Sequence, residues 1–588
     1  MEKGIILVRK MFLVMMSLVL FAINIEFTHS AEIGRYVNYA ESLKNLGLFW
    51  GTNNGFELTR NSTRAEAAAM LVRLLGAESE AFSNIKAHPF KDVPQWADPY
   101  IGFLYNEGLT VGISDINYGS QQMISASEYT TFLLRALGYS DRDGDFYWKD
   151  SLEFAQSIHM VSVEEANSIK GLNGFTRDYM VKFSYNSLYT LGKDSNEFLI
   201  DSLYKKGAIS NNTENEKREF NIDNEMRAVW ISYLDLQPIF RSNGKDGFTQ
   251  EVRMMYKNIK DLGLNTVIVQ VRPFGDAIYP SSYFPWSHII TGEEGKDPGY
   301  DPLSILVKEA HNQGLKIEAW LNPYRLRSNK SALSNNNIGL KWLNDGSNRA
   351  IQIKEGIFFN PGSKDAQNLI VEGIKEIIKK YDVDGIHFDD YFYPSIDLSY
   401  DYNDFQEYLA AGGTLSQGEW RRENVNSLIR GVYKVIKEIN PNISFGISPQ
   451  NDIQKNYDQL YIDIEKWVNT PGYIDYIVPQ IYFGFEHSKY PFEIEVKEWN
   501  HFMKNSNVRL YIGLSAYKIG IEDKWAGSAK LEWTTELEML KRMVMMSREN
   551  INYDGFMIFR YDSLWKPGRG VREMVENERI ALRTILTF

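Results

Sequence analysis

The chain has 588 residues, of which 44% are hydrophobic and 24% charged, and this length and balance predict a soluble protein of two or more domains. Its net charge of −12 argues against nucleic acid as the main partner. The absence of cysteine excludes disulfides, thiol catalysis, thiolate metal sites and a cysteine-linked lipid anchor.

Residues 1–30 have the pattern of a secretory signal peptide. Lys3, Arg9 and Lys10 give a positive start, Met11–Ile23 is an apolar core, and small residues follow where cleavage is expected. A retained membrane anchor is the alternative, but the apolar run is short for a span of roughly 20 residues. The protein is therefore predicted to be secreted, with no membrane span after signal removal.

A pattern recurs three times in the region 31–215, at about residues 31–85, 86–142 and 143–215. Each copy is predicted to contain a helix, a loop and a second helix capped by Ser or Thr. Units of this length cannot bury a face alone, so the copies are expected to stack. The polar segment 216–225 is predicted to be a linker.

One short motif marks the second helix of a copy. It reads Thr-Arg-Ala-Glu at 63–66 and is partly kept at 176–178, whereas Ala126 replaces the arginine in the second copy. With these motifs, most of residues 33–215 resembles the S-layer homology module. The resemblance implies binding to anionic secondary polysaccharides of the bacterial cell wall, and thus attachment to the wall or surface layer. A helical spacer without ligand is the alternative. The residues implied to bind the polymer are Thr63, Arg64, Glu66 and Arg177.

From 226 to 588, apolar strands alternate with amphipathic helices, which is typical of a parallel α/β fold. Eight strand candidates predict a (β/α)8 TIM barrel after the all-α repeats. An open doubly wound sheet is disfavoured because no glycine-rich nucleotide-binding turn follows a strand. The candidates are Arg227–Tyr233, Thr266–Arg272, Lys316–Asn322, Gly385–Asp389, Ser444–Ser448, Tyr476–Tyr482, Arg509–Ser515 and Gly555–Arg560.

Polar side chains are expected to converge at the C-terminal ends of these strands. Side chains alternate between the faces of a strand, so the apolar set should meet the helices and the polar set should point into the barrel. Barrel enzymes place their chemistry at the C-terminal ends. The strands supply Arg272, Asn322, His387, Asp389, Gln480 and Tyr482, and the loops add Asp276, Tyr324, Arg325, Asp390, Tyr391, Asp452, Tyr517 and Asp562.

Carboxylates together with aromatics, amides and arginine fit cleavage of glycosidic bonds. That reaction needs one carboxylic acid to protonate the leaving oxygen and one carboxylate as base or nucleophile. Asp389 is the first candidate, whereas Asp390 reaches the site only if the strand breaks before it. The alternative for Asp390 is a hydrogen-bonded loop carboxylate. If both are close, one pKa should rise, and the other candidates for the acid are Asp276, Asp452 and Asp562.

Other inward residues are predicted to support the site or to contact the sugar. Glu318 is expected to pair internally, with Arg227 or Arg272, and His387 either orients Asp389 or a sugar hydroxyl, or is a satisfied core histidine. Aromatic stacking on sugar rings is predicted for Trp320, Tyr391, Tyr482 and Tyr517.

No metal or cofactor is predicted. A metal-dependent deacetylase also uses an Asp-Asp pair, but it needs a His-x-x-x-His spacing, which none of the eight histidines has.

Seven stretches of the second half carry a family pattern, namely Arg227–Trp230, Val271–Ala277, Tyr279–Ser281, Ala319–Arg325, Asp384–Tyr391, Gly446–Pro449 and Pro479–Tyr482. Through them, residues 224–588 resemble the glycosyl-hydrolase-like family 10 barrels of bacterial envelopes. The resemblance implies a glycosidase acting on amino-sugar glycans, with peptide-stripped peptidoglycan strands as the leading substrate and Asp389 and Asp390 in or beside the catalytic role.

A weaker likeness to the Asp-Gly-x-Asp-x-Asp-x-Glu strand of family 18 chitinases lacks two acids, because His387 and Tyr391 replace them. A barrel that holds wall glycan without cutting it is the alternative function. The residues predicted to bind the glycan are Arg272, Asp276, Trp320, Asn322, Tyr324, Arg325, His387, Tyr391, Gln480, Tyr482 and Tyr517.

Overall fold

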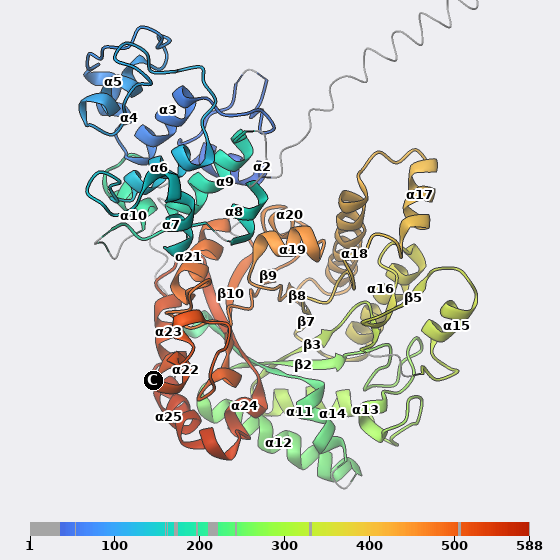
Figure 1. Ribbon diagram of the computed structural model, residues 1–588. Helices are drawn as coiled ribbons and strands as arrows, with labels where there is room; N and C mark the ends of the chain where they lie inside the picture. The colour runs from blue at the N-terminus through green and yellow to red at the C-terminus, as the bar shows by residue number, and fades with distance from the viewer. Residues whose placement is uncertain are drawn as a thin grey trace, which may run out of the picture. The chain divides into compact units, whose positions relative to one another are not determined.

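The computed structural model describes two parts of the chain. They are residues 36–209, except 53, 159, 162, 170–173, 194 and 196–197, and residues 222–586, except 242–243, 329–331 and 504–506. The predicted signal peptide and most of the predicted linker lie outside the described residues. The chain divides into two compact units, residues 1–216 and 217–588 (Figure 1). In the described ranges, every helix is too short or too polar to span a lipid bilayer.

The first unit is built on three helices, one from each sequence copy, which contact one another. They are α3 (Arg64–Leu74), α6 (Ala126–Ala136) and α9 (Arg177–Leu188). Thr63 and Ser125 begin the first two with capping boxes, in which the cap hydroxyl and a glutamate three residues later satisfy each other's backbone N–H groups. Around them lie α2 (Val37–Asn45), α4 (Glu78–Ser83), α5 (Asp98–Asn106), α7 (Ser151–Ser157), α8 (Val163–Ile169) and α10 (Leu199–Lys205).

The starts of the three central helices are joined by contacts between copies. The backbone N–H of Ser62 donates to Phe175 at 2.9 Å, and that of Ile124 donates to Ser62 at 3.0 Å. The motif side chains extend the same linkage, because Arg177 pairs with Glu66 at 2.7 Å. The helix starts are therefore the point at which the three copies are held together.

A second ion pair between copies joins Arg64 to Glu128 at 2.7 Å. The corresponding arginine is missing from the second copy, where Ala126 stands. Asp178, the acidic residue of the third copy, instead accepts the backbone N–H of Tyr36 at 2.8 Å. The Thr-Arg-Ala-Glu pattern thus has a structural explanation as a set of bonds between copies.

The four residues implied to bind polymer are engaged in this linkage. Arg177 is 4% exposed and Glu66 18%, and Arg64 is 12% exposed. Thr63 caps α3 through its hydroxyl. These side chains therefore contribute to the contacts between copies, and their binding to the polymer stays a prediction.

The second unit is a barrel of eight parallel strands within the described residues, which confirms the predicted (β/α)8 fold after an all-α unit. Around the barrel the strand order is β1, β11, β10, β9, β8, β7, β3 and β2. The strands are β1 (Met226–Ile231), β2 (Thr266–Arg272), β3 (Lys316–Leu321), β7 (Gly385–Phe388), β8 (Ser444–Ile447), β9 (Tyr476–Ile477), β10 (Arg509–Ser515) and β11 (Tyr553–Phe559).

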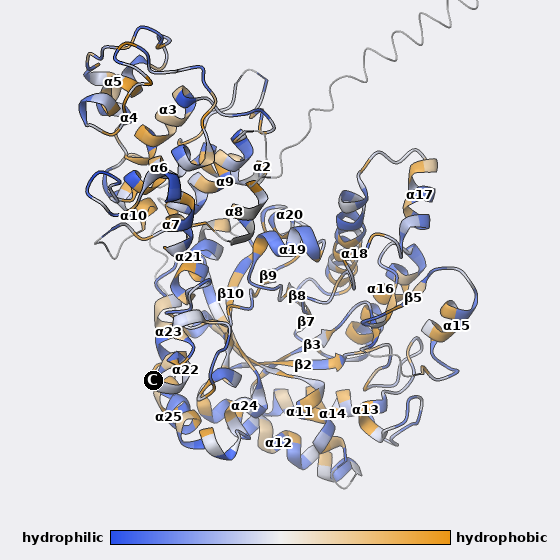
Figure 2. Cartoon of the chain, viewed as in Figure 1, coloured by the Kyte–Doolittle hydropathy of each residue, from blue (hydrophilic) through white to orange (hydrophobic). Residues whose placement is uncertain are grey.

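Amphipathic helices cover the barrel, and hydrophilic and hydrophobic residues lie side by side along helices such as α12 and α18 (Figure 2). A small antiparallel sheet, which the sequence pattern did not predict, occupies the long segment between β3 and β7. It consists of β4 (Arg325–Arg327), β5 (Ala350–Ile353) and β6 (Gly356–Phe359).

The helices of this unit are α11 (Tyr233–Phe240), α12 (Gly244–Leu262), α13 (His288–Thr291), α14 (Pro302–Asn312), α15 (Ile338–Asn344), α16 (Lys364–Lys380), α17 (Tyr402–Ala410), α18 (Gln417–Ile439), α19 (Ile453–Gln459), α20 (Ile464–Asn469), α21 (Phe492–Phe502), α22 (Glu532–Thr535), α23 (Met539–Ser547), α24 (Tyr561–Trp565) and α25 (Arg572–Arg583).

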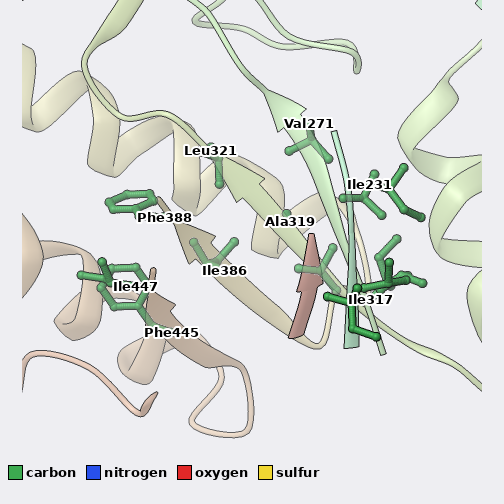
Figure 3. Close-up of a cluster of buried hydrophobic side chains, with 14 of the residues drawn as sticks. Ile231, Val271, Ile317, Ala319, Leu321, Ile386, Phe388, Phe445 and Ile447 are labelled. Atoms are coloured by element: carbon green, nitrogen blue, oxygen red, sulfur yellow. The ribbon is translucent and has the colours of Figure 1, made fainter. Parts of the chain in front are cut away.

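Strand alternation produces two separate apolar layers. The outer layer, between strands and helices, includes Ile317, Leu321, Ile386 and Phe388 (Figure 3). The inner cluster fills the barrel and consists of Ala228, Trp230, Ile268, Trp320, Tyr476, Val478, Tyr511 and Met557. Polar side chains in phase with this inner cluster therefore project into the barrel.

A bulge in β2 changes the predicted position of Arg272. The register with β3 shifts between Gln270 and Arg272, so Arg272 lies beside Leu321 of the outer layer. Its guanidinium stacks on Phe284 at 4.5 Å, and that ring lies against Gly373 of α16. The prediction that Arg272 points into the barrel is therefore wrong, because the alternation loses its phase at the bulge.

We expect the Arg177–Glu66 pair to contribute strongly to the stability of the first unit. Replacing the buried Arg177 by Met should lower its free energy of unfolding by about 3 kcal/mol, since the other charge stays partly buried. Arg60, which is 37% exposed and also pairs with Glu66, supplies a matched control. Arg60→Met should cost less than about 1 kcal/mol. Urea denaturation of the full chain measures both, and equal losses would contradict a structural role for the motif arginine.

Candidate active site

Asp389 and Asp390 directly follow the last residue of β7. The strand ends at Phe388, one residue earlier than predicted, so the break required for Asp390 to reach the site is present. Asp390 is half-buried and accepts an N–H from Gln450 at 3.0 Å and a further bond from the side chain of Gln480. These glutamines follow β8 and β9 and lie opposite each other. The pair is therefore held by three consecutive barrel strands.

Asp389 is 5% exposed and is surrounded by N–H donors. Its Oδ2 accepts bonds from Asn322 Nδ2 at 2.5 Å and from Trp320 Nε1 at 3.1 Å. Its Oδ1 accepts the backbone N–H of Tyr391 at 3.3 Å. Trp320 thus orients a carboxylate through its indole N–H and is buried, whereas stacking on a sugar was predicted for it.

The orientation of Asn322 is fixed by a chain of amides that we call the amide chain. The backbone N–H of Tyr233, at the start of α11, donates to Gln270 Oε1 at 3.0 Å, and Gln270 Nε2 donates to Asn322 Oδ1 at 2.6 Å. A backbone N–H can only donate, so each successive amide has one permitted orientation. Gln270 is 2% exposed and Asn322 is fully buried. The amide chain therefore directs an N–H group at Asp389.

Burial dominates the acidity of the pair. It raises the pKa of Asp389 to about 7, and the neighbouring charge of Asp390 acts in the same direction, against Arg325 and the bond from Asn322. Burial also raises the pKa of Asp390, against the bonds from its two glutamines. Two adjacent carboxyl groups therefore retain a proton close to neutral pH.

Aromatic rings and one arginine surround the pair. Tyr391 is 49% exposed and lies 4.5 Å from the guanidinium of Arg325. Tyr482 stacks on Phe559 at 5.8 Å and meets Tyr517 edge-on at 6.0 Å, and Tyr517 is 41% exposed. Burial raises the pKa of Tyr482, and the charges of Tyr517, Asp390 and Asp389 act in the same direction. These rings offer flat apolar faces beside acid and base groups.

His387 belongs to the barrel interior and has no exposed surface. Its Nε2 accepts the indole N–H of Trp230 at 3.1 Å, so Nδ1 carries the proton and donates to Tyr476 Oη at 2.9 Å. Burial lowers the pKa of His387 to about 3, so its imidazole is neutral. The predicted contact between His387 and substrate is wrong, and the core-histidine alternative fits its contacts.

Glu318 pairs internally, as expected, but with different partners. It accepts hydrogen bonds from the hydroxyl of Tyr476 and from Ser444 Oγ, the latter at 2.7 Å, and burial raises its pKa to about 7. The predicted partners, Arg227 and Arg272, lie elsewhere: Arg227 donates to the carbonyls of Gly263 and Ile222.

Two loop residues that were predicted at the site are packed away from it. Asp276 is fully buried and accepts bonds from Ser287 at 2.8 Å, His288 Nδ1 at 2.6 Å and Arg327 at 3.2 Å. Tyr324 is fully buried in the outer apolar layer. Both predictions are wrong because Asp276 is bonded to residues at the start of α13 and in β4, while Tyr324 is packed into the outer apolar layer.

The other candidate acids also have partners of their own. Asp452 caps α19 and accepts the hydroxyl of Tyr490 at 3.0 Å, while Asp562 lies 3.6 Å from Lys566 and 3.9 Å from Arg560. Among the described residues, no three His, Asp or Glu side chains are grouped as ligands for a metal ion.

Gln270 and Gln450 are site residues that the predicted set omitted. Gln270 shares the inward phase of β2, which was a usable signal. Gln450 lies in the loop after β8, beyond the reach of strand alternation.

The chain is similar to proteins that are named glycosyl hydrolases. A family model described as Glycosyl hydrolase-like 10 matches residues 225–527. "Glycosyl hydrolase YngK" of Bacillus subtilis (strain 168) is 35% identical over 361 residues, which cover 56% of this chain and 69% of that protein. "Glycosyl hydrolase DigH" of Escherichia coli (strain K12) is 33% identical over 383 residues, 58% of this chain and 84% of that protein. A "Cell surface protein" of Thermoanaerobacter kivui is 27% identical over 154 residues, 26% of this chain and 20% of that protein.

The amide chain predicts a measurable pKa. Gln270→Met removes the bond that fixes Asn322, so the ionised form of Asp389 loses a donor and its pKa should rise further above about 7. Titration of carboxyl ¹³C shifts by NMR, with Asp389→Asn to assign the signal, measures this.

The control for this titration is Gln367→Met. Gln367 is also buried, at 4% exposed, and donates to the carbonyls of Pro361 and Asn424. It should leave the Asp389 titration unchanged. An unchanged titration in Gln270→Met as well would show that the amide chain does not act on Asp389.

Proposed function

Since the chain belongs to the Glycosyl hydrolase-like 10 family and is a glycoside hydrolase, we propose that its barrel cleaves amino-sugar glycans, with peptide-stripped peptidoglycan strands as substrate. The observation that carries this proposal is the adjacent pair Asp389 and Asp390 at the end of β7. It retains a proton near neutral pH, as an acid catalyst requires.

The catalytic work is assigned to this pair. Hydrolysis needs a proton for the departing glycosidic oxygen and an anionic group near the sugar carbon, which carries positive charge in the transition state. One carboxyl of the pair supplies the proton and the other supplies the anion. The guanidinium of Arg325 lowers the pKa of both aspartates and so opposes a second proton on the pair.

Substrate contacts are assigned to side chains that surround the carboxylates and keep exposed surface. Tyr391 and Tyr517 are suited to stack against sugar rings, and Tyr482 supports them from a half-buried position. Gln480 and Arg325 supply polar groups for sugar hydroxyls. Arg272, Asp276, Tyr324 and His387 are left out of this assignment because their side chains are fully buried.

We also propose that the protein is exported and held at the cell wall by its first unit. The signal-peptide pattern of residues 1–30 and the three sequence copies support this, and so does the partial similarity to a cell surface protein. The proposed ligand is the anionic secondary polysaccharide. The proposed contacts stay Thr63, Arg64, Glu66 and Arg177, of which Arg64 and Glu66 keep 12% and 18% of their side-chain surface exposed.

Hydrolysis can be tested on amidase-treated peptidoglycan with mass spectrometry of the products. The wild type should release oligosaccharides, and Asp389→Asn should lower the rate by a factor of about 10² to 10⁴, the usual contribution of an acid–base group. Asp397→Asn changes an exposed aspartate on the same loop and should retain activity. If the wild type releases no more product than Asp389→Asn, the proposed function is incorrect.

Wall attachment can be tested by sedimentation of the full chain with purified walls. Binding should fall at least about tenfold when the secondary polymer is extracted, because phosphate- or carboxylate-bearing polymers supply the charge that the unit would recognise. Unchanged binding after extraction would contradict the assignment of this polymer.

A further inference from the structure

The two catalytic carboxylates stand on neighbouring residues, which limits the roles they can share. A double displacement by two carboxylates needs them on opposite faces of the sugar, roughly 5 Å apart, and inversion needs a still wider gap for water. Asp389 and Asp390 leave one strand end together. The other candidates, Asp276, Asp452 and Asp562, are engaged elsewhere in the described barrel. The nucleophile is therefore best supplied by the substrate.

The surroundings of the two carboxylates differ. Asp389 is 5% exposed and its Oδ2 already accepts two N–H groups, whereas Oδ1 accepts only the 3.3 Å bond from Tyr391 in the described structure. A carboxylate oxygen can accept a second donor, so Oδ1 retains capacity for one. Asp390 is half-buried and hence more accessible to a leaving group. Asp389 therefore has the surroundings of a fixed hydrogen-bond acceptor, and Asp390 has those of an acid that the leaving group can reach.

We propose that Asp389 accepts the N–H of a 2-acetamido group on the substrate while Asp390 protonates the leaving oxygen, so that the acetamido carbonyl oxygen is the nucleophile. The inference rests on the proposed amino-sugar substrate and adds the requirement for an N-acetyl group. Gln270 and Asn322 then act as positioning residues, because they hold Asp389 in the acceptor orientation.

The reaction balances without any further reactant. The acetamido oxygen forms a bond to C1 as the bond from C1 to the leaving oxygen breaks, and the proton of Asp390 moves to that oxygen. The cyclic oxazolinium ion is stabilised by ionised Asp389 at its N–H. Water then adds to C1, its proton returns to Asp390, and the ring reopens to the acetamide. Two displacements at C1 leave the anomeric configuration retained.

Substrate binding itself places the proton on Asp390. The groups that face Asp389 are Asp390 and Tyr391 after β7, Arg325 after β3, and Tyr482 after β9. In the free enzyme, burial holds a proton on the pair. An acetamido N–H donated to Asp389 favours its ionised form, so the shared proton moves to Asp390, where the leaving oxygen needs it.

Two comparisons of activity test the proposal. Removal of N-acetyl groups from the peptide-stripped strands should lower kcat/KM at least about 10²-fold, since the nucleophile is lost. With 4-methylumbelliferyl chitooligosaccharides, whose leaving group needs no proton, Asp390→Asn should recover activity and Asp389→Asn should not. Equal cleavage of acetylated and deacetylated strands by the wild type would overturn the proposal and leave the proposed function standing.

A binding measurement decides the same point without turnover. The thiazoline analogue of the cyclised N-acetylglucosamine intermediate presents the ring nitrogen that Asp389 should bind. Calorimetry should show binding to the wild type and to Asp390→Asn, and at least tenfold weaker binding to Asp389→Asn, the loss of about one charge-assisted hydrogen bond. Equal affinity for both variants would overturn the proposal. If the wild type binds the analogue but cleaves no strands, the choice of peptidoglycan fails while the inference holds.

Discussion

The site depends on the burial of one carboxylate against a fixed set of N–H donors. Asp389 is nearly removed from solvent, which disfavours its charge, while Asn322 and Trp320 stabilise that charge from the barrel interior. The balance leaves its pKa close to neutrality. A less buried aspartate would be permanently ionised, and one without donors would be permanently neutral. Neither would serve a pair that must exchange one proton during each turnover.

The barrel provides that balance through its architecture. The side-chain donors to Asp389 lie in β3 or directly after it, and the donors to Asp390 follow β8 and β9, so the pair is positioned by strands on both sides of β7. The amide chain begins at a backbone N–H of α11, a group that helix formation leaves without an internal partner. The orientation of Asn322 is therefore tied to the first βα unit. Positioning by rigid elements is what a charge-stabilising site needs.

Much of this arrangement could be predicted from the sequence. The apolar strands gave the eight-stranded barrel, and period-two alternation identified Asn322, Asp389 and Gln480 as residues that converge. It failed where the backbone leaves the regular strand. A bulge moved Arg272 into the outer layer, and the loop residues Asp276 and Tyr324 are fully buried, which no local pattern records.

In the first unit, the sequence could not predict contacts between residues that are distant along the chain. Its Thr-Arg-Ala-Glu pattern was readable, but the contacts made by Arg64 and Arg177 lie far away in sequence, so their role in joining copies needed the structure.

A complex of the Asp390→Asn variant with an N-acetylated glycan strand would test the central claim most directly. The account predicts the acetamido nitrogen within about 3 Å of Asp389 Oδ1, with the side chain at position 390 against the glycosidic oxygen and no carboxylate on the opposite face of the sugar. A carboxylate on that opposite face, with the acetamido group turned away from Asp389, would contradict it.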